Sequence, residues 1–419
     1  MSVLIVAIPL FGENMTVKAY RLCDHNPDLA LDTKDDFRGK TQGFDQPGLE
    51  LIQKIGLEPF TGELPLLVDT SRFHILTGMY SINNIPASKL ILTLPGNLEI
   101  DSKVLMGLEG MRGRGYSIAV DGYPEDGIEN HLLGFADHII LDFADKQFQQ
   151  RYDEIKRKLP DKRRIVANMP DVETYEKLSR NSNTLFTGAF YKNPVTSGDS
   201  EISPLKVNAL RLMKQINEED FDLRNISQTI ERDPALSISL LSFINSPAVG
   251  LRTKVDSISS AVAILGQKSV QRWATIAISM GISEDRPGEV TKLSLVRAKF
   301  AENLAPMFEM AIFQNSLFMT GLFSLLDNIL QKPMEEAIKE VAVDNLVYDA
   351  LVNHTGSLYK VMEFIYAYEH ANWHQLSIMS IQNGIKSDQL GQAFIDALVW
   401  YHQLLTSIDE SSGEPTKEV

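Results

Sequence analysis

The sequence predicts two domains of different class, α/β plus all-α. In the first half of the chain, short apolar runs alternate with stretches of helical periodicity, which is typical of βα units around a parallel sheet. After Pro204 the strand-like runs stop, and apolar residues recur only at helical spacing. The 419 residues suit this division, because domains commonly hold on the order of 150 residues. We therefore expect a TIM-like βα barrel followed by a helical domain.

Six apolar runs predict buried strands of the barrel. They are Ser2–Ile8, Leu66–Val68, Leu90–Leu94, Ser117–Val120, His138–Asp142 and Ile165–Ala167. Helices are expected between them, at Gly48–Ile55, Arg72–Ser81, Ser102–Arg112 and Phe148–Leu159. The number of repeats and a length of roughly 195 residues fit a small or incomplete βα barrel, in which functional groups stand at the carboxyl ends of the strands.

The domain boundaries follow from a change in composition. The stretch Val195–Ser203 is rich in Ser, Gly and Asp and has no periodicity, so we expect a linker there. It separates a barrel over residues 1–194 from a helical domain over residues 204–405, and residues 406–419 form a polar tail. Within the helical part, Asp256 or Ser257 is expected to cap a helix that Gly266 ends.

Charge and cysteine content exclude several classes of function. The formal net charge of -15 and the sequence pI near 5.1 oppose binding to nucleic acid and to anionic membranes. Cys23 is the only cysteine, so an intrachain disulfide and a Cys-based zinc site are both excluded, which fits a reducing cytoplasm. No apolar run reaches the length of a membrane span. We therefore expect a cytoplasmic protein.

One basic cluster runs against this acidic balance, at Arg151, Lys156–Lys158 and Lys162–Arg164. Acidic residues interrupt it, and Pro160 lies in its middle. We prefer to interpret it as a solvated helix and its exit turn, and the alternative is a phosphate-binding patch.

The segment Asp233–Trp273 carries the most specific pattern of the helical half. It reads DPALSISLLSFINSPAVGLRTKVDSISSAVAILGQKSVQRW, with Asp233-Pro234, a Leu-rich helix into Asn245-Ser246, and a helix from Ser257 to Gly266 that ends in ILG. This pattern resembles the core of HDOD domains, which are helical relatives of the HD metal-dependent phosphohydrolases.

Three segments of the first half point to a second family. PLFGENMTVKAYRL is similar to the opening strand pair of EAL domains, the barrels of cyclic di-GMP phosphodiesterases. SIAVDGYPEDG looks like the segment that carries their Asp-Asp-Phe-Gly motif, and FTGAFYKNP resembles their closing segment with a Gln-Gly-aromatic and a Lys-Pro element. In this order and beside the HDOD-like half, they make the chain resemble EAL–HDOD two-domain bacterial signal transduction proteins.

The resemblance to EAL enzymes implies where metal ligands would stand, and most of these positions differ here. The Glu of the family's name falls at Arg21, whose guanidinium repels a cation instead of binding it. The Asn ligand falls at Asp69 and the next Glu at Thr93, and the two consecutive Asp residues fall at Asp121 and Gly122. The lysine falls at Ile140, a late Glu near Asn168 with Glu173 close by, and the closing Gln at Thr187.

Two interpretations of Asp69 and Asp121 remain open. The preferred one makes them ordinary polar residues at strand ends. The alternative is an ion pair between Arg21 and Asp121 that fills the former metal site and fixes the pocket.

The resemblance to HD enzymes implies metal-ligand positions in the second half, and these also hold other residues. Those enzymes bind metal through a His, a His-Asp pair and a later Asp. The pair falls at Ser324 and Leu325 and the earlier His at about Ala298, and none of these side chains can serve there. Asp327 lies two residues after Leu325, the position of the Asp in the pair, and is expected to face elsewhere on its helix. We expect no metal or other cofactor in either half.

Three further patterns have two interpretations each. His370 and His374 have zinc-like spacing, but an exposed helix is preferred because no third ligand is evident. The Gly-rich Gly110–Tyr116 is assigned to a helix stop and turn, not to a phosphate cradle. Aromatic and Met side chains are assigned to the core in preference to a groove for a partner helix. They are Trp273, Phe300, Met307, Phe308, Met310, Phe313, Phe318, Met319 and Phe323.

The residues at the positions derived from the EAL and HD resemblances predict a non-catalytic regulator of bacterial signal transduction. It would act through contacts with other signalling proteins, and a homodimer is a candidate assembly. The alternative is a cyclic di-GMP receptor without hydrolysis, in which Arg21 and Lys192 supply positive charge. An enzyme with a relocated site ranks last, because the sequence shows no new carboxylate cluster.

Overall fold

The protein forms two compact units in a computed structural model of the whole chain. The first unit comprises Met1–Asn193, Ala367–Ser380 and Lys386–Gly391, and the second comprises Pro194–Tyr366, Ile381–Ile385 and Gln392–Val419. The two short C-terminal segments of the first unit are a difference from the expected division, which assigned them to the helical domain. The structure describes residues 3–25, 47–78, 85–180, 183–195, 204–217, 227, 230–231, 240–241, 244–245, 255–283 and 287–412.

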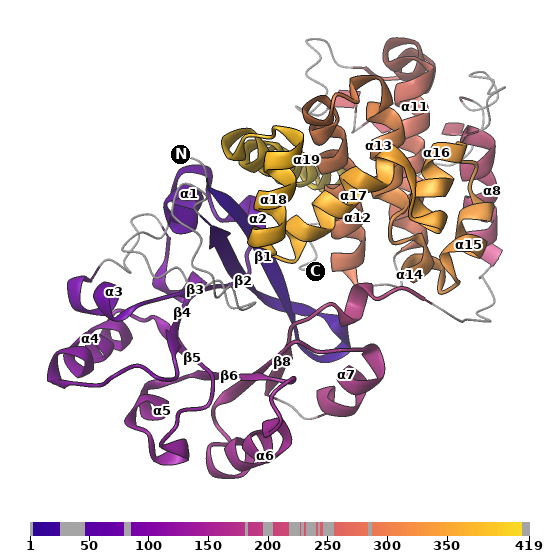
Figure 1. The fold of residues 1–419 in the computed structure, drawn as a ribbon. Helices are drawn as coiled ribbons and strands as arrows, with labels where there is room; N and C mark the ends of the chain where they lie inside the picture. The colour runs from indigo at the N-terminus through magenta and orange to yellow at the C-terminus, as the bar shows by residue number, and fades with distance from the viewer. Residues whose placement is uncertain are drawn as a thin grey trace. The chain divides into compact units, whose positions relative to one another are not determined.

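Eight strands close into a barrel in chain order, as Figure 1 shows. Strands β2 to β8 run parallel to one another, and β1 is antiparallel to both of its neighbours, β2 and β8. The strands are β1 Leu4–Phe11, β2 Val17–His25, β3 Leu66–Asp69, β4 Leu90–Pro95, β5 Ser117–Asp121, β6 His138–Asp142, β7 Arg163–Ala167 and β8 Thr184–Phe186.

The expected βα order is confirmed, and the sheet is closed. Helices lie between the strands and outside the barrel (Figure 1). They are α1 Pro47–Ile55, α2 Glu58–Thr61, α3 Arg72–Thr77, α4 Ser102–Gly113, α5 His131–Phe135, α6 Phe148–Lys158 and α7 Val172–Ser179. The helix expected to reach Ser81 ends at Thr77, because Gly78 takes a left-handed conformation with φ 72° and its N–H bonds to His74 O.

The inside of the barrel is a packed layer of apolar side chains, one from each strand. They are Leu10, Ala19, Leu67, Ile91, Ala119, Ile140, Ile165 and Leu185. Side chains on a strand alternate between its two faces, so the residue two positions further along each parallel strand again points inward. This second layer lies nearer the carboxyl ends of the strands, and it holds the polar groups.

The second unit is helical over the residues described. Ser257 caps α11, because its side chain accepts a hydrogen bond from Ser260 N. Gly266 has φ 72° and ψ 169°, so it breaks α11 where the sequence predicts a helix end, although helix resumes beyond it. The helices lying wholly in this unit are α8 Pro204–Asn217, α11 Ile258–Ile282, α12 Gly288–Leu304, α13 Gln314–Phe323, α14 Leu326–Leu330, α15 Met334–Ala337 and α16 Asn345–Tyr348.

Three further helices contain residues assigned to both units. They are α17 Gly356–Glu369, α18 Trp373–Asn383 and α19 Ser387–Ser412.

Most of the aromatic and Met side chains assigned to the core are buried. Trp273, Phe300, Phe318 and Phe323 are each less than 3% exposed. Helices α12 and α13 approach closely at Gly321, where an added Cβ would lie 2.6 Å from Ala298 Cα. The small side chains at Gly321 and Ala298 therefore allow this packing.

Several sequence predictions lie outside the described residues. These are the Asp233-Pro234 element, Ser246, residues 196–203 of the expected linker and residues 413–419 of the expected tail. Among the helices of the described ranges, none combines the length and the hydropathy needed to cross a bilayer.

Candidate functional site

The polar layer at the carboxyl ends of the strands brings together the residues singled out from the EAL resemblance. Arg21 lies on β2, two residues after the core residue Ala19. Asp69 and Asp121 are the last residues of β3 and β5, each two positions beyond a core residue. They converge because neighbouring parallel strands end on the same side of the barrel.

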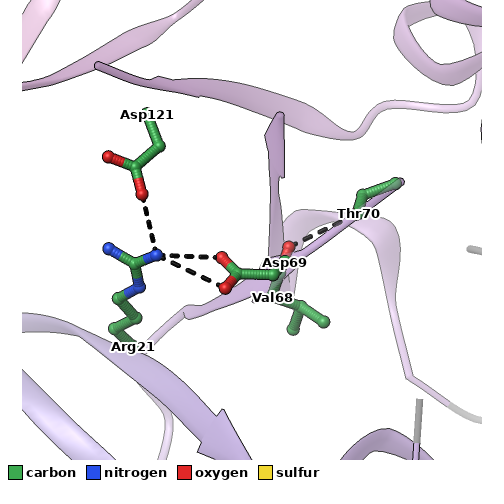
Figure 2. A network of polar contacts seen from close by, with 5 residues as sticks. All are labelled: Arg21, Val68, Asp69, Thr70 and Asp121. Atoms are coloured by element: carbon green, nitrogen blue, oxygen red, sulfur yellow. Dashed lines mark hydrogen bonds and ion pairs between the residues drawn. The ribbon is translucent and has the colours of Figure 1, made fainter. Parts of the chain in front are cut away.

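Arg21 binds both aspartates, as Figure 2 shows. Its Nη2 lies 2.9 Å from Asp121 Oδ2, and 3.1 Å and 3.4 Å from the two carboxylate oxygens of Asp69. The ion pair of Arg21 with Asp121, held as the alternative, is therefore present in the structure. The pairing with Asp69 is an addition that the sequence alone does not predict.

The charges at this site are partly removed from water. The side chains of Arg21, Asp69 and Asp121 are 15%, 33% and 17% exposed. Burial by itself would lower the pKa of Arg21, but the carboxylates of Asp69 and Asp121 outweigh it, and the net shift is upward. The guanidinium therefore stays charged, and it lies within hydrogen-bonding distance of both carboxylates.

The other EAL-derived positions do not join this network. Thr93 pairs in register with Asp69 but is buried, and its Oγ1 has no hydrogen-bond partner among the described residues. Ile140 belongs to the apolar layer inside the barrel, and Thr187 is buried beyond β8. None of these three side chains offers a carboxylate or an amine.

Asn168 makes a separate contact with Asp142, which is not one of the positions derived from the EAL resemblance. Its Nδ2 donates to Asp142 Oδ1 at 2.9 Å, and its backbone has φ 59°. Asp142 ends β6 and also accepts a hydrogen bond from Ala144 N. A repeated pattern could have identified Asp142, because LLVD, IAVD and IILD each end a buried strand in aspartate.

Two buried groups on β2 also lie near the site. Asp24 accepts a hydrogen bond from Gly48 N at 2.7 Å, which ties β2 to the start of α1. Burial raises the pKa of Asp24 to about 6, although the hydrogen bond from Gly48 opposes the shift. Burial likewise raises the pKa of the Cys23 thiol to about 12, against the effect of Arg21. Cys23 is therefore protonated and inert as a nucleophile at neutral pH.

The positions derived from the HD resemblance lie together in the second unit. Ala298 is fully buried on α12, and Ser324 and Leu325 are buried after α13. Beside Ala298, Arg297 donates through Nη1 to Ser324 Oγ at 3.0 Å, so a second arginine lies among these positions. Its guanidinium also lies 5.0 Å from the ring centre of Tyr366.

Asp327 does not point into this group of positions. Its carboxylate accepts a hydrogen bond from Val195 N at 3.0 Å, and burial raises its pKa. The expectation that Asp327 faces elsewhere agrees with this contact.

The histidine pair and the Gly-rich stretch also have clear positions. The single exposed helix expected to carry both His370 and His374 is wrong, because α17 ends at Glu369 and α18 begins at Trp373, with a turn between them. His374 is nevertheless exposed on α18. The Gly-rich stretch is a helix end and turn as predicted, since α4 ends at Gly113 and Gly115 has φ 86°.

Over the ranges that the structure describes, no three His, Cys, Asp or Glu side chains form a metal-binding group.

The basic cluster lies on and after α6 and is largely engaged within the barrel. Arg151 pairs with Asp145 and lies over the ring of Tyr123, and Lys158 pairs with Glu154 at 2.8 Å. Arg164 is 3% exposed. These contacts agree with the preferred interpretation of a helix and its exit turn.

Comparisons with known proteins place these positions in a family context. A model described as "HDOD domain" matches residues 202–348. The uncharacterized protein YuxH of Bacillus subtilis (strain 168) is 25% identical over 424 residues, covering 97% of this chain and 99% of YuxH. Cyclic di-GMP phosphodiesterase CdgJ of Vibrio cholerae serotype O1 is 22% identical over 319 residues, covering 75% of this chain and 74% of CdgJ.

Among solved structures, the chain is similar to the cAMP-bound EAL enzyme Bd1971, with a TM-score of 0.36 and 13% identity. The match covers 46% of this chain and 63% of the Bd1971 chain, which is less than two thirds of that protein. The closed barrel with its antiparallel first strand, the order of the three EAL-like segments and the HDOD match agree with one another. The chain is therefore similar to EAL–HDOD proteins in its order of domains, a closed βα barrel followed by a helical region that matches the HDOD model over residues 202–348.

Proposed function

We propose that this protein is a non-catalytic regulator in bacterial signalling related to cyclic di-GMP, and that it acts through protein contacts. The observation that carries the proposal is the ion pair of Arg21 with Asp69 and Asp121. Hydrolysis of a phosphodiester by metal ions needs oxygen ligands that converge on an open cation position. Here a guanidinium holds that position, and it cannot be deprotonated at any physiological pH.

The second unit supports the same proposal independently. A metal site of the HD type would need imidazole and carboxylate groups at Ala298, Ser324 and Leu325. An alanine, a serine and a leucine stand there, and the Ser324 hydroxyl accepts its hydrogen bond from Arg297. Two unrelated sites therefore share the same feature, an arginine among the positions of metal ligands.

Two competing functions have weaker support. The relative CdgJ is named as a cyclic di-GMP phosphodiesterase, so hydrolysis of cyclic di-GMP is the first alternative function for this chain. A receptor without hydrolysis would need free positive charge for the phosphates of the ligand. Arg21 is paired with two aspartates, and Lys192 lies 3.6 Å from the buried carboxylate of Glu369. The charges that a receptor would use are therefore already engaged.

The decisive experiment measures turnover of cyclic di-GMP by the purified full-length chain with Mg²⁺ or Mn²⁺. Separation of the linear product by chromatography is expected to show none. Product that disappears in the Asp69→Asn/Asp121→Asn variant would overturn the proposal, because a contaminating enzyme would be insensitive to that change. Calorimetric titration of the same sample tests the receptor, and a flat titration is the expected result.

A further inference from the structure

The first strand of the barrel has a long edge that its neighbour does not cover. β1 is eight residues long and β8 only three, and among the described residues they pair at one position, Phe11 with Phe186. Between Leu4 and Leu10 the backbone on this side of β1 therefore needs other partners. An uncovered strand edge is unfavourable when buried and promotes pairing with other chains when exposed.

A tyrosine from the far end of the chain satisfies part of this edge. Ile5 N donates to Tyr368 Oη at 3.2 Å, and the same hydroxyl donates to Ile5 O at 3.1 Å. The N–H and C=O of one strand residue point to the same side, so both groups of Ile5 face away from β2. Tyr368 thus makes the two hydrogen bonds that a neighbouring strand would make at this position.

The contact is part of a buried arrangement within the first unit. Ile5 and Tyr368 are both fully buried, and burial raises the pKa of the Tyr368 hydroxyl, which keeps its proton available for donation. Trp373 stacks on His25 of β2 with ring centres 5.7 Å apart, and it also meets Tyr368 edge-on at 5.7 Å. The aromatic contacts therefore extend from β1 to β2.

A second contact reaches the start of β1. A Cβ added at Gly391 would lie 2.5 Å from Val3 O, so only glycine allows the chain to approach the strand this closely. Gly391 lies in α19 and Tyr368 in α17, and both belong to the first unit. Two points of the C-terminal region, 23 positions apart by their numbers, thus contact β1 within three residues of each other.

We propose that residues 367–380 and 386–391, which we call the edge cover, complete the open edge of β1 locally and control access to it. The surface is the unpaired side of β1, and its occupant is this chain's own C-terminal region. The edge cover lies beyond the HDOD match, which ends at residue 348. The contacts of Tyr368 and Gly391 with β1 do not involve Arg21, and displacement of the edge cover would expose the edge of β1. This inference does not depend on the proposed function.

Hydrogen exchange of the full-length chain tests the inference with two pairs of matched variants. Tyr368→Phe removes only the oxygen that bonds Ile5, and Tyr359→Phe makes the same change elsewhere on α17. Gly391→Ala places a methyl group against Val3 O, and Gly281→Ala places one in open space on α11. We expect Tyr368→Phe and Gly391→Ala to accelerate exchange in residues 3–11 roughly three- to tenfold, the effect of losing one or two net hydrogen bonds.

The segments in which hydrogen exchange accelerates decide whether the inference holds. Acceleration confined to β1 and the edge cover, and absent in both control variants, supports the inference. Unchanged exchange at residues 3–11 overturns it. Equal acceleration in β4 and β5 also overturns it, because the contacts would then contribute only to the global stability of the unit.

Discussion

Arg21 donates a hydrogen bond to Asp121 at 2.9 Å across 100 residues of sequence, and the same nitrogen bonds Asp69. The link joins Arg21 in the middle of β2 to the last residues of β3 and β5 (Figure 2). Two carboxylates this close to each other repel unless a positive charge lies between them. Arg21 thus offsets the repulsion between Asp69 and Asp121.

The first prediction concerns the stability that Arg21 contributes. Arg21→Ala leaves two partly buried carboxylates without their counter-charge, and we expect a loss on the order of 2 kcal/mol in the free energy of unfolding at pH 7. Urea denaturation measures it. Arg72→Ala is the matched control, because Arg72 pairs with Asp101 at an exposed position and a much smaller loss is expected. Equal losses for the two variants would contradict the role given to Arg21.

The second prediction concerns metal binding. Arg21→Glu would place a third carboxylate beside Asp69 and Asp121, and three converging carboxylates suit a divalent cation. Mn²⁺ is expected to raise the melting temperature of this variant and to leave the wild type and Arg21→Gln unchanged. A shift of the same size in the wild type would mean that the guanidinium does not block the position.

The third prediction follows from the raised pKa of Asp24. Its ordinary value is 3.8 and its value in the folded chain is about 6, so between these values the folded state binds more protons than the unfolded state. Stability therefore falls as the pH rises from about 4 to about 6, by up to about 3 kcal/mol from this group. Asp24→Asn keeps an acceptor for Gly48 N and removes the titration.

The measurement for Asp24 is the difference in unfolding free energy between Asp24→Asn and the wild type at pH 4 and pH 7. We expect the variant to gain stability over the wild type as the pH rises. Glu125→Gln, at an exposed position, serves as the control for the loss of one negative charge. A pH-independent difference for Asp24→Asn would show that Asp24 does not titrate in this range.

The fourth prediction concerns the second arginine. Ser324→Ala removes the hydroxyl that accepts a hydrogen bond from the buried Arg297. A buried N–H group that loses its acceptor lowers the free energy of unfolding by about 1 to 3 kcal/mol. Thermal unfolding is expected to show this loss. Ser316→Ala on α13 is the control, because its contact with Asp344 is exposed. A loss no greater than that of Ser316→Ala would contradict a structural role for the Arg297–Ser324 contact.

Much of the barrel could be predicted from the sequence because its strands are buried on both faces. Runs such as LILTL and HIILD are mostly apolar, and their order specifies βα units. The apolar runs predict neither β2 nor β8, because charged residues interrupt β2 and three residues are too few for a periodicity to be seen in β8. The end of α3 was misplaced, because Gly78 stops the helix by its left-handed backbone and not by its polarity.

The candidate site was predicted in its residues but not in its contacts. Arg21, Asp69 and Asp121 were identified individually, whereas the sequence favoured treating the aspartates as ordinary strand-end residues. Which side chains meet depends on strand register and on the closure of the sheet. Both are determined by packing between distant segments.

The sequence by itself determined the two domain classes, most of the order of the strands and helices, and the residue types at the positions that correspond to metal ligands of EAL and HD enzymes. These properties are local, because they depend on periodicity and on side-chain chemistry at single positions. Only the tertiary structure decided that Arg21 bridges Asp69 and Asp121 and that Tyr368 completes the edge of β1. Such contacts join residues 48 to 363 positions apart, and they form only when the burial of apolar surface brings those segments together.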